Sequence, residues 1–147
     1  MKILFIHQNF PGQYRHLAPH FAADPHNQVV SISERRDERP LNIPKIRHLL
    51  YDKPKGASAA THHYIRNLEA SVRRGQAVLR VAFDLKRDGF VPDVICAHPG
   101  WGESLYIKEV FPQARLLNFF EFYYRNKGSD VGFDAEFPYD CVINHRN

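Results

Sequence analysis

The sequence opens with MKILFIHQNFPGQYRHLAPHF at residues 1–21, and this stretch decides the fold. Its apolar run ILFI at residues 3–6 is typical of a central parallel strand that is covered on both faces. After a polar loop, apolar side chains recur at spacings of three and four, at Tyr14, Leu17, Ala18 and Phe21. This period predicts an amphipathic helix over residues 12–23, and a bend is expected at Pro19 because proline lacks the N–H of the helix ladder.

Strand and helix patterns alternate along the rest of the chain. Further strands are expected at residues 28–33, 46–50, 94–97 and 115–120, and further helices at residues 61–87 and 103–110. Pro44 precedes the 46–50 strand, which favours an edge position for it. The order predicts an α/β fold: a Rossmann-like, doubly wound parallel sheet of about five strands in the order 3-2-1-4-5.

Composition limits the class of protein. The 147 residues have the size of one domain, and no run of eighteen apolar residues or signal-peptide core occurs. Cys96 and Cys141 form no CxxC pair, which fits a reducing compartment, so a cytoplasmic protein is expected. The net charge of +4 is spread without a compact Lys/Arg block. A solvated basic face is therefore favoured over a nucleic-acid partner.

Ligands of such sheets bind beyond the carboxyl ends of the strands, where the strand order reverses. The loop at residues 7–12 lies at this position, and Gly12 there opens a helix whose free N–H groups can receive a phosphate. The alternative is that Pro11 and Gly12 form only a tight turn. The absence of GxGxxG and GxxxxGK[ST] argues against a dinucleotide oxidoreductase and a P-loop nucleotidase.

The loop at residues 98–103 follows the strand that is expected beside the first one. His98 can donate or accept a hydrogen bond to a ligand there, or it can be a structural histidine. Trp101 can stack on a sugar ring or fill the core, and Glu103 can bind a ligand hydroxyl or sit in the first turn of a helix. Glu121, among aromatic residues beyond the last strand, is a candidate carbohydrate contact, with pairing to Arg125 as the alternative.

Metal and hydrolase sites are not favoured. The pairs His16/His20 and His62/His63 have no cysteine or carboxylate partner at a zinc-like spacing, so no metal is expected. The strained GxSxG turn of the α/β-hydrolases is also missing.

Four segments together resemble the N-terminal domain of bacterial family 4 glycosyltransferases of the GT-B fold. They are residues 1–21, AHPGWGESLYIKEVFP at 97–112, LLNFFEFYYR at 116–125 and VGFDAEFP at 131–138. The resemblance implies one half of a two-domain, retaining enzyme, a hexosyltransferase that needs no metal or other cofactor. Such an enzyme moves a sugar from a nucleotide-sugar donor to a glycan or lipid-linked acceptor.

The resemblance also assigns roles to residues. Gly12 and Gln13 approach the donor diphosphate, and His98 acts as the catalytic residue near the transferring sugar. Trp101, Glu103 and Glu121 contact the acceptor.

The chain departs from the family in one respect. The glutamate pair of the family, two glutamates separated by seven residues, belongs to the C-terminal, donor-binding domain and does not occur here. We therefore expect an acceptor-side domain at residues 1–125, an irregular segment at 126–147, and no catalysis without the missing domain. The basic charge permits peripheral contact with the inner membrane face. The alternative hypothesis is a stand-alone Rossmann-like module that binds a phosphorylated or glycosylated ligand.

Overall fold

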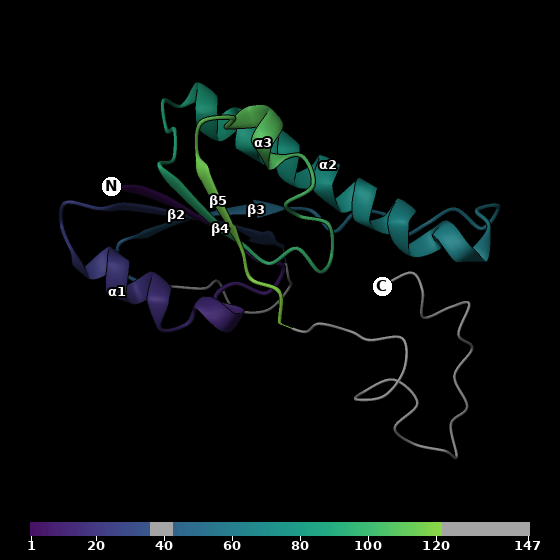
Figure 1. The fold of residues 1–147 in the computed structure, drawn as a ribbon, viewed down its shortest axis with the longest axis horizontal. Helices are drawn as coiled ribbons and strands as arrows, with labels where there is room; N and C mark the ends of the chain where they lie inside the picture. Colours follow the sequence, from purple (N-terminus) through teal and green to yellow (C-terminus); the bar gives the residue numbers. More distant parts are fainter. Residues whose placement is uncertain (36–42, 122–147) are drawn as a thin grey trace, which may run out of the picture.

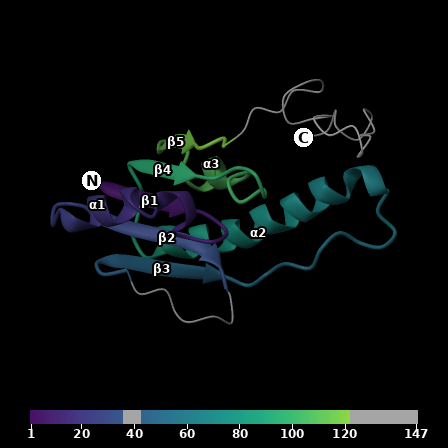
Figure 2. The same cartoon turned by 90° about the horizontal axis from the view of Figure 1, so that it is seen from below.

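The computed structural model describes residues 1–35 and 43–121, which form one twisted parallel sheet with helices on both faces (Figure 1). The strands are β1 (Lys2–Ile6), β2 (Gln28–Glu34), β3 (Ile46–Tyr51), β4 (Val94–Ala97) and β5 (Arg115–Asn118). They pair in the order β3-β2-β1-β4-β5, which can be followed from one edge to the other in Figure 2. The predicted α/β class and strand order are confirmed.

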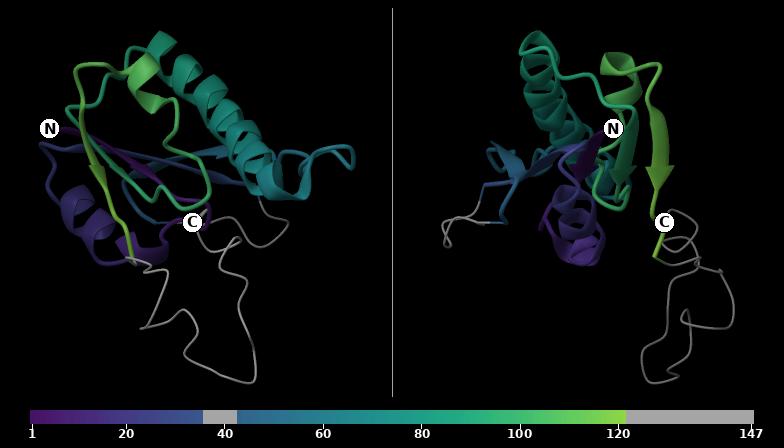
Figure 3. Two further views of the ribbon diagram at one scale, coloured as in Figure 1. Left: turned by 45° about the vertical axis from the view of Figure 1, so that its right-hand side comes forward. Right: turned by 90° about the vertical axis from the view of Figure 1, so that its left-hand side faces the viewer.

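The helices cover the sheet from opposite sides, as Figure 3 shows. Helix α1 (Leu17–Ala23) lies on one face, while α2 (Arg66–Arg87) and α3 (Ile107–Val110) lie on the other. Alternate residues of β1 supply both cores, because side chains of a strand point to opposite faces in turn. Phe5 packs with the α1 side, and Leu4 packs with the α2 side.

The helices begin later than the sequence pattern predicts. A 3₁₀ helix at Gly12–Tyr14 precedes α1, and Pro19 then falls in the first turn of α1, where its missing N–H breaks no ladder bond. A second 3₁₀ helix, His63–Ile65, precedes α2. The predicted helix 103–110 is α-helical only from Ile107.

Gly102 explains the late start of α3. It has a φ of +98°, and a Cβ on it would lie 2.4 Å from the Ser71 carbonyl oxygen of α2. The chain is therefore pressed against α2 in a non-helical conformation, which puts turns before α3. Within residues 1–35 and 43–121, no helix is both long and apolar enough to cross a membrane. The segment 126–147, Cys141 and Arg125 lie outside the described residues.

Candidate functional site

Two histidines meet where the carboxyl ends of β1 and β4 lie side by side. Ile6 is in register with Ala97, so the next residue on each strand, His7 and His98, lies at the same edge of the sheet. Their ring centroids are 5.3 Å apart, and both residues are buried. His98 is a candidate from the sequence and His7 is not, although His7 has the same position directly after a central strand.

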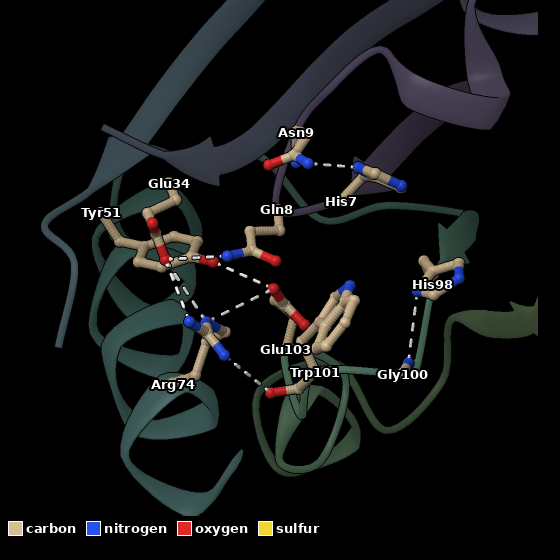
Figure 4. Close-up of polar contacts among 10 residues, drawn as sticks. All are labelled: His7, Gln8, Asn9, Glu34, Tyr51, Arg74, His98, Gly100, Trp101 and Glu103. Carbon is tan, nitrogen blue, oxygen red and sulfur yellow. Dashed lines mark hydrogen bonds and ion pairs between the residues drawn. The ribbon is translucent and has the colours of Figure 1, made fainter. Parts of the chain in front are cut away.

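Each of these rings is fixed by a hydrogen bond of the same kind, from a backbone N–H to Nδ1 (Figure 4). The Asn9 backbone N–H donates to Nδ1 of His7 at 2.9 Å, and the Gly100 N–H donates to Nδ1 of His98 at 3.3 Å. Because a backbone N–H can only donate, both Nδ1 atoms are acceptors without a proton. Each neutral imidazole therefore carries its hydrogen on Nε2.

Glycines make room for both rings. A Cβ on Gly12, whose φ is +44°, would lie 2.5 Å from Cε1 of His7, and a Cβ on Gly100 would lie 2.7 Å from Cε1 of His98. Either methyl group would push an imidazole out of its position. Gly12 is thus required by local packing, and its predicted contact with a diphosphate stays a prediction.

A carboxylate joins the histidines from beyond β5. Glu121 Oε2 accepts a hydrogen bond from Nε2 of His98 at 3.1 Å, and its Oε1 accepts one from the Gln13 side-chain amide. These bonds, first the one from Gln13 and then the one from His98, lower the pKa of the Glu121 carboxyl. The structure therefore brings together His98, Gln13 and Glu121, for which the family resemblance implies three different roles.

Glu103 lies in a different environment, inside a polar network between the sheet and α2 (Figure 4). The residue is 1% exposed, its Oε1 accepts a hydrogen bond from the Tyr51 hydroxyl at 3.0 Å, and Arg74 Nε lies 3.7 Å from the same oxygen. Arg74 also pairs with Glu34 at 3.3 Å.

Burial raises the pKa of the Glu103 carboxyl, and its Oε2 is a buried atom with no hydrogen-bond partner among residues 1–35 and 43–121. In this conformation Glu103 faces protein groups, and α3 begins too late for it to be a first-turn acid. Its predicted contact with an acceptor stays a prediction.

Trp101 is held by its backbone and leaves its ring at the surface. Its carbonyl oxygen accepts a hydrogen bond from Arg74 at 3.4 Å, and the residue is 52% exposed. The alternative that Trp101 fills the core is therefore wrong. An exposed indole is suited to stacking on a sugar ring, and this role stays a prediction.

The histidine pairs considered for metal binding lie apart from this rim. His62 and His63 stack on each other just before α2, with ring centroids 4.4 Å apart, and His16 and His20 are exposed beside and on α1. Among the described residues, no group of three or more histidine, cysteine or acidic side chains is arranged to hold a metal ion. The expectation of a metal-independent protein stays a prediction.

Comparison with known protein families finds a match for most of the chain. The family model described as the Glycosyl transferase family 4 group matches residues 25–147. This range includes the loop with His98 and Trp101 and the position of Glu121, while His7 and Gly12 precede it. No curated protein and no solved structure matches the chain.

Proposed function

The chain belongs to the glycosyl transferase family 4 group, and on this premise we propose that it is the acceptor-side domain of a retaining GT-B glycosyltransferase. The enzyme moves a sugar from a nucleotide-sugar donor to a glycan or lipid-linked acceptor without a metal. Residues 1–125 form this domain, and a second domain binds the nucleotide. The convergence of His98, Gln13 and Glu121 at the β1–β4 switch is the observation that carries the proposal.

His98 takes part as a neutral hydrogen-bond donor. Its Nδ1 accepts the Gly100 N–H, so the ring offers a hydrogen on Nε2 and no free acceptor for a general base. A donor of this kind can hold an oxygen of the transferring sugar. The Gln13 amide and the backbone at Gly12 would approach the departing diphosphate, where charge develops in the transition state.

The acceptor contacts lie on the adjoining surface. The exposed ring of Trp101 offers a stacking platform, and the carboxylate of Glu121 can accept a hydrogen bond from an acceptor hydroxyl. Glu103 acts on this surface indirectly, because its Oε1 and the backbone of Trp101 are both contacted by Arg74.

Sugar transfer by the natural enzyme with both domains tests the proposal. Transfer from a panel of nucleotide sugars to glycan and lipid acceptors is measured in the presence of EDTA, for the wild type, His98→Ala and His26→Ala. Loss of the positioned hydrogen-bond donor, the Nε2–H of His98, is expected to reduce kcat by about 10²–10³-fold in His98→Ala. His26 is exposed in the turn after α1 and serves as the matched control.

Three outcomes are distinguishable. Unchanged turnover in His98→Ala removes His98 from the mechanism. Loss of activity in EDTA that is restored by a divalent cation overturns the metal-independent reaction. Binding of phosphorylated or glycosylated ligands without transfer from any nucleotide sugar favours the stand-alone binding module.

A further inference from the structure

We infer that His7 is a second ligand-binding imidazole, which together with His98 and Gln13 forms a site for a phosphoryl oxyanion at the β1–β4 switch. In this structure the carboxylate of Glu121 occupies that site. The assignment of the oxyanion to a nucleotide-sugar donor rests on the proposed function, while the site itself rests on the contacts described below.

His7 and His98 are built alike. Each directly follows a central strand, and each ring accepts the backbone N–H of the residue two positions further along. Each is also accompanied by a glycine that leaves space for the ring. A histidine that only fills space does not need a fixed tautomer, whereas here two rings with the same tautomer follow neighbouring strands, with their centroids 5.3 Å apart.

Glu121 shows which kind of ligand the site accepts. Two N–H donors, from His98 and Gln13, hold its two carboxylate oxygens. The His7 ring lies beside the His98 ring that donates to Glu121, with ring centroids 5.3 Å apart. Carboxylate and phosphoryl oxygens are both anionic acceptors, so the same donors serve either group.

Glu121 and a phosphoryl group compete, because two anions repel each other at hydrogen-bond distance from shared donors. The Glu121 side chain is 39% exposed, so it can rotate away from the rim into solvent. Once displaced, its carboxylate becomes available to an acceptor hydroxyl, as proposed above. Binding of the nucleotide-sugar donor and binding of the acceptor substrate would thereby be coupled through the Glu121 side chain.

Histidine side-chain ¹⁵N NMR of the 147-residue chain, titrated with inorganic pyrophosphate, tests the site. Without ligand, Nδ1 of His7 and His98 should show the resonance of an unprotonated acceptor, and Nε2 that of a protonated donor. Pyrophosphate should shift both Nε2–H resonances and leave His26 unchanged. A shift of His98 alone, or of neither ring, overturns the inference, and this measurement needs no variant.

Two variants make the test quantitative. His7→Gln should weaken pyrophosphate binding by about tenfold or more, because a hydrogen bond to a charged group is lost. Glu121→Gln should strengthen it by at least about fivefold, because the competing charge is removed. His26→Gln serves as the control. Wild-type affinity in His7→Gln with an unchanged melting curve, or weaker binding in Glu121→Gln, overturns the inference.

Failure of this inference is separable from failure of the proposed function. If pyrophosphate binding depends on His7 but the natural enzyme transfers no sugar, the oxyanion site stands and the proposed transferase activity is refuted. If the His7→Gln variant transfers sugar normally, the transferase activity stands and the role of His7 in the site is refuted.

Discussion

Arg74 lies between two buried carboxylates, and its replacement by methionine should strongly destabilise the fold. The side chains of Arg74, Glu34 and Glu103 are 15%, 5% and 0% exposed. Methionine retains most of the packing volume but leaves both carboxylates without this cation. Removing one partner of a buried ion pair costs about 3–5 kcal/mol, a large part of the roughly 5–15 kcal/mol that stabilises a typical domain.

The lower end of that range is expected, for two reasons. Arg74 retains some contact with solvent, and the Gln8 amide and the Tyr51 hydroxyl still donate to the carboxylates of Glu34 and Glu103. We therefore expect Arg74→Met to lose about 3 kcal/mol of unfolding free energy near neutral pH.

The loss should depend on pH with a definite sign. Burial already raises the pKa of Glu103 above its ordinary value of 4.5, and the positive charge of Arg74 opposes that rise. Without Arg74, Glu103 keeps its proton up to a higher pH in the folded state than in the unfolded chain. The stability of the variant therefore falls as pH rises from the unfolded pKa of Glu103 to its raised folded pKa. The deficit of the variant should therefore shrink from about pH 7 to about pH 5.

Urea unfolding at several pH values, monitored by circular dichroism, measures both effects. Arg80→Met, an exposed arginine on the same helix, is the control and should change stability by less than about 0.5 kcal/mol. Adding Glu103→Gln to Arg74→Met should recover part of the loss. A deficit below about 1 kcal/mol near neutral pH, or one that stays constant across the pH series, would refute the reasoning.

Three further predictions concern the loop at residues 98–103, which Arg74 contacts. Glu103→Gln keeps an acceptor for Tyr51 but removes the charge, so its urea midpoint should equal or exceed that of the wild type near pH 8 and depend less on pH; a large loss would contradict burial as the cause of the raised pKa. Gly102→Ala should lower the thermal midpoint well beyond Gly89→Ala, because both glycines have positive φ but only Gly102 has no space for a Cβ; equal shifts would show that the loop yields easily. Trp101→Ala should leave the thermal midpoint nearly unchanged and raise the acceptor KM in the natural enzyme, and an unchanged KM would remove Trp101 from the acceptor site.

The sheet could be predicted from the sequence because its determinants are local. The apolar run of β1 and the short run of β4 read directly as buried strands, and the helical period of α2 is unmistakable over its length. Pro44 marked β3 as an edge strand, where the structure places it. In a parallel sheet the loops after neighbouring strands lie at the same edge, so the proximity of the two rim loops is also predictable.

The conformation of those loops was not predictable in the same way. The turn before α3 depends on Gly102 meeting Ser71 and Gly75, which are far from it in sequence. The sequence indicates Glu103 as a ligand contact or a first-turn acid, and only the packing of α2 shows that Arg74 and Tyr51 contact it in the interior. Contacts of this kind leave no periodic pattern in a single sequence.

The hydrogen bonds that fix His7 and His98 also bear on how such a site can diverge. Each Nδ1 is held by a main-chain N–H, at Asn9 and at Gly100, so the acceptor state of these two atoms follows from the shape of the loops. Substitution of neighbouring side chains leaves these two main-chain hydrogen bonds in place as long as the loops keep their shape. Such a site cannot accommodate insertions that change the two-residue spacing between each histidine and the main-chain N–H that donates to its Nδ1.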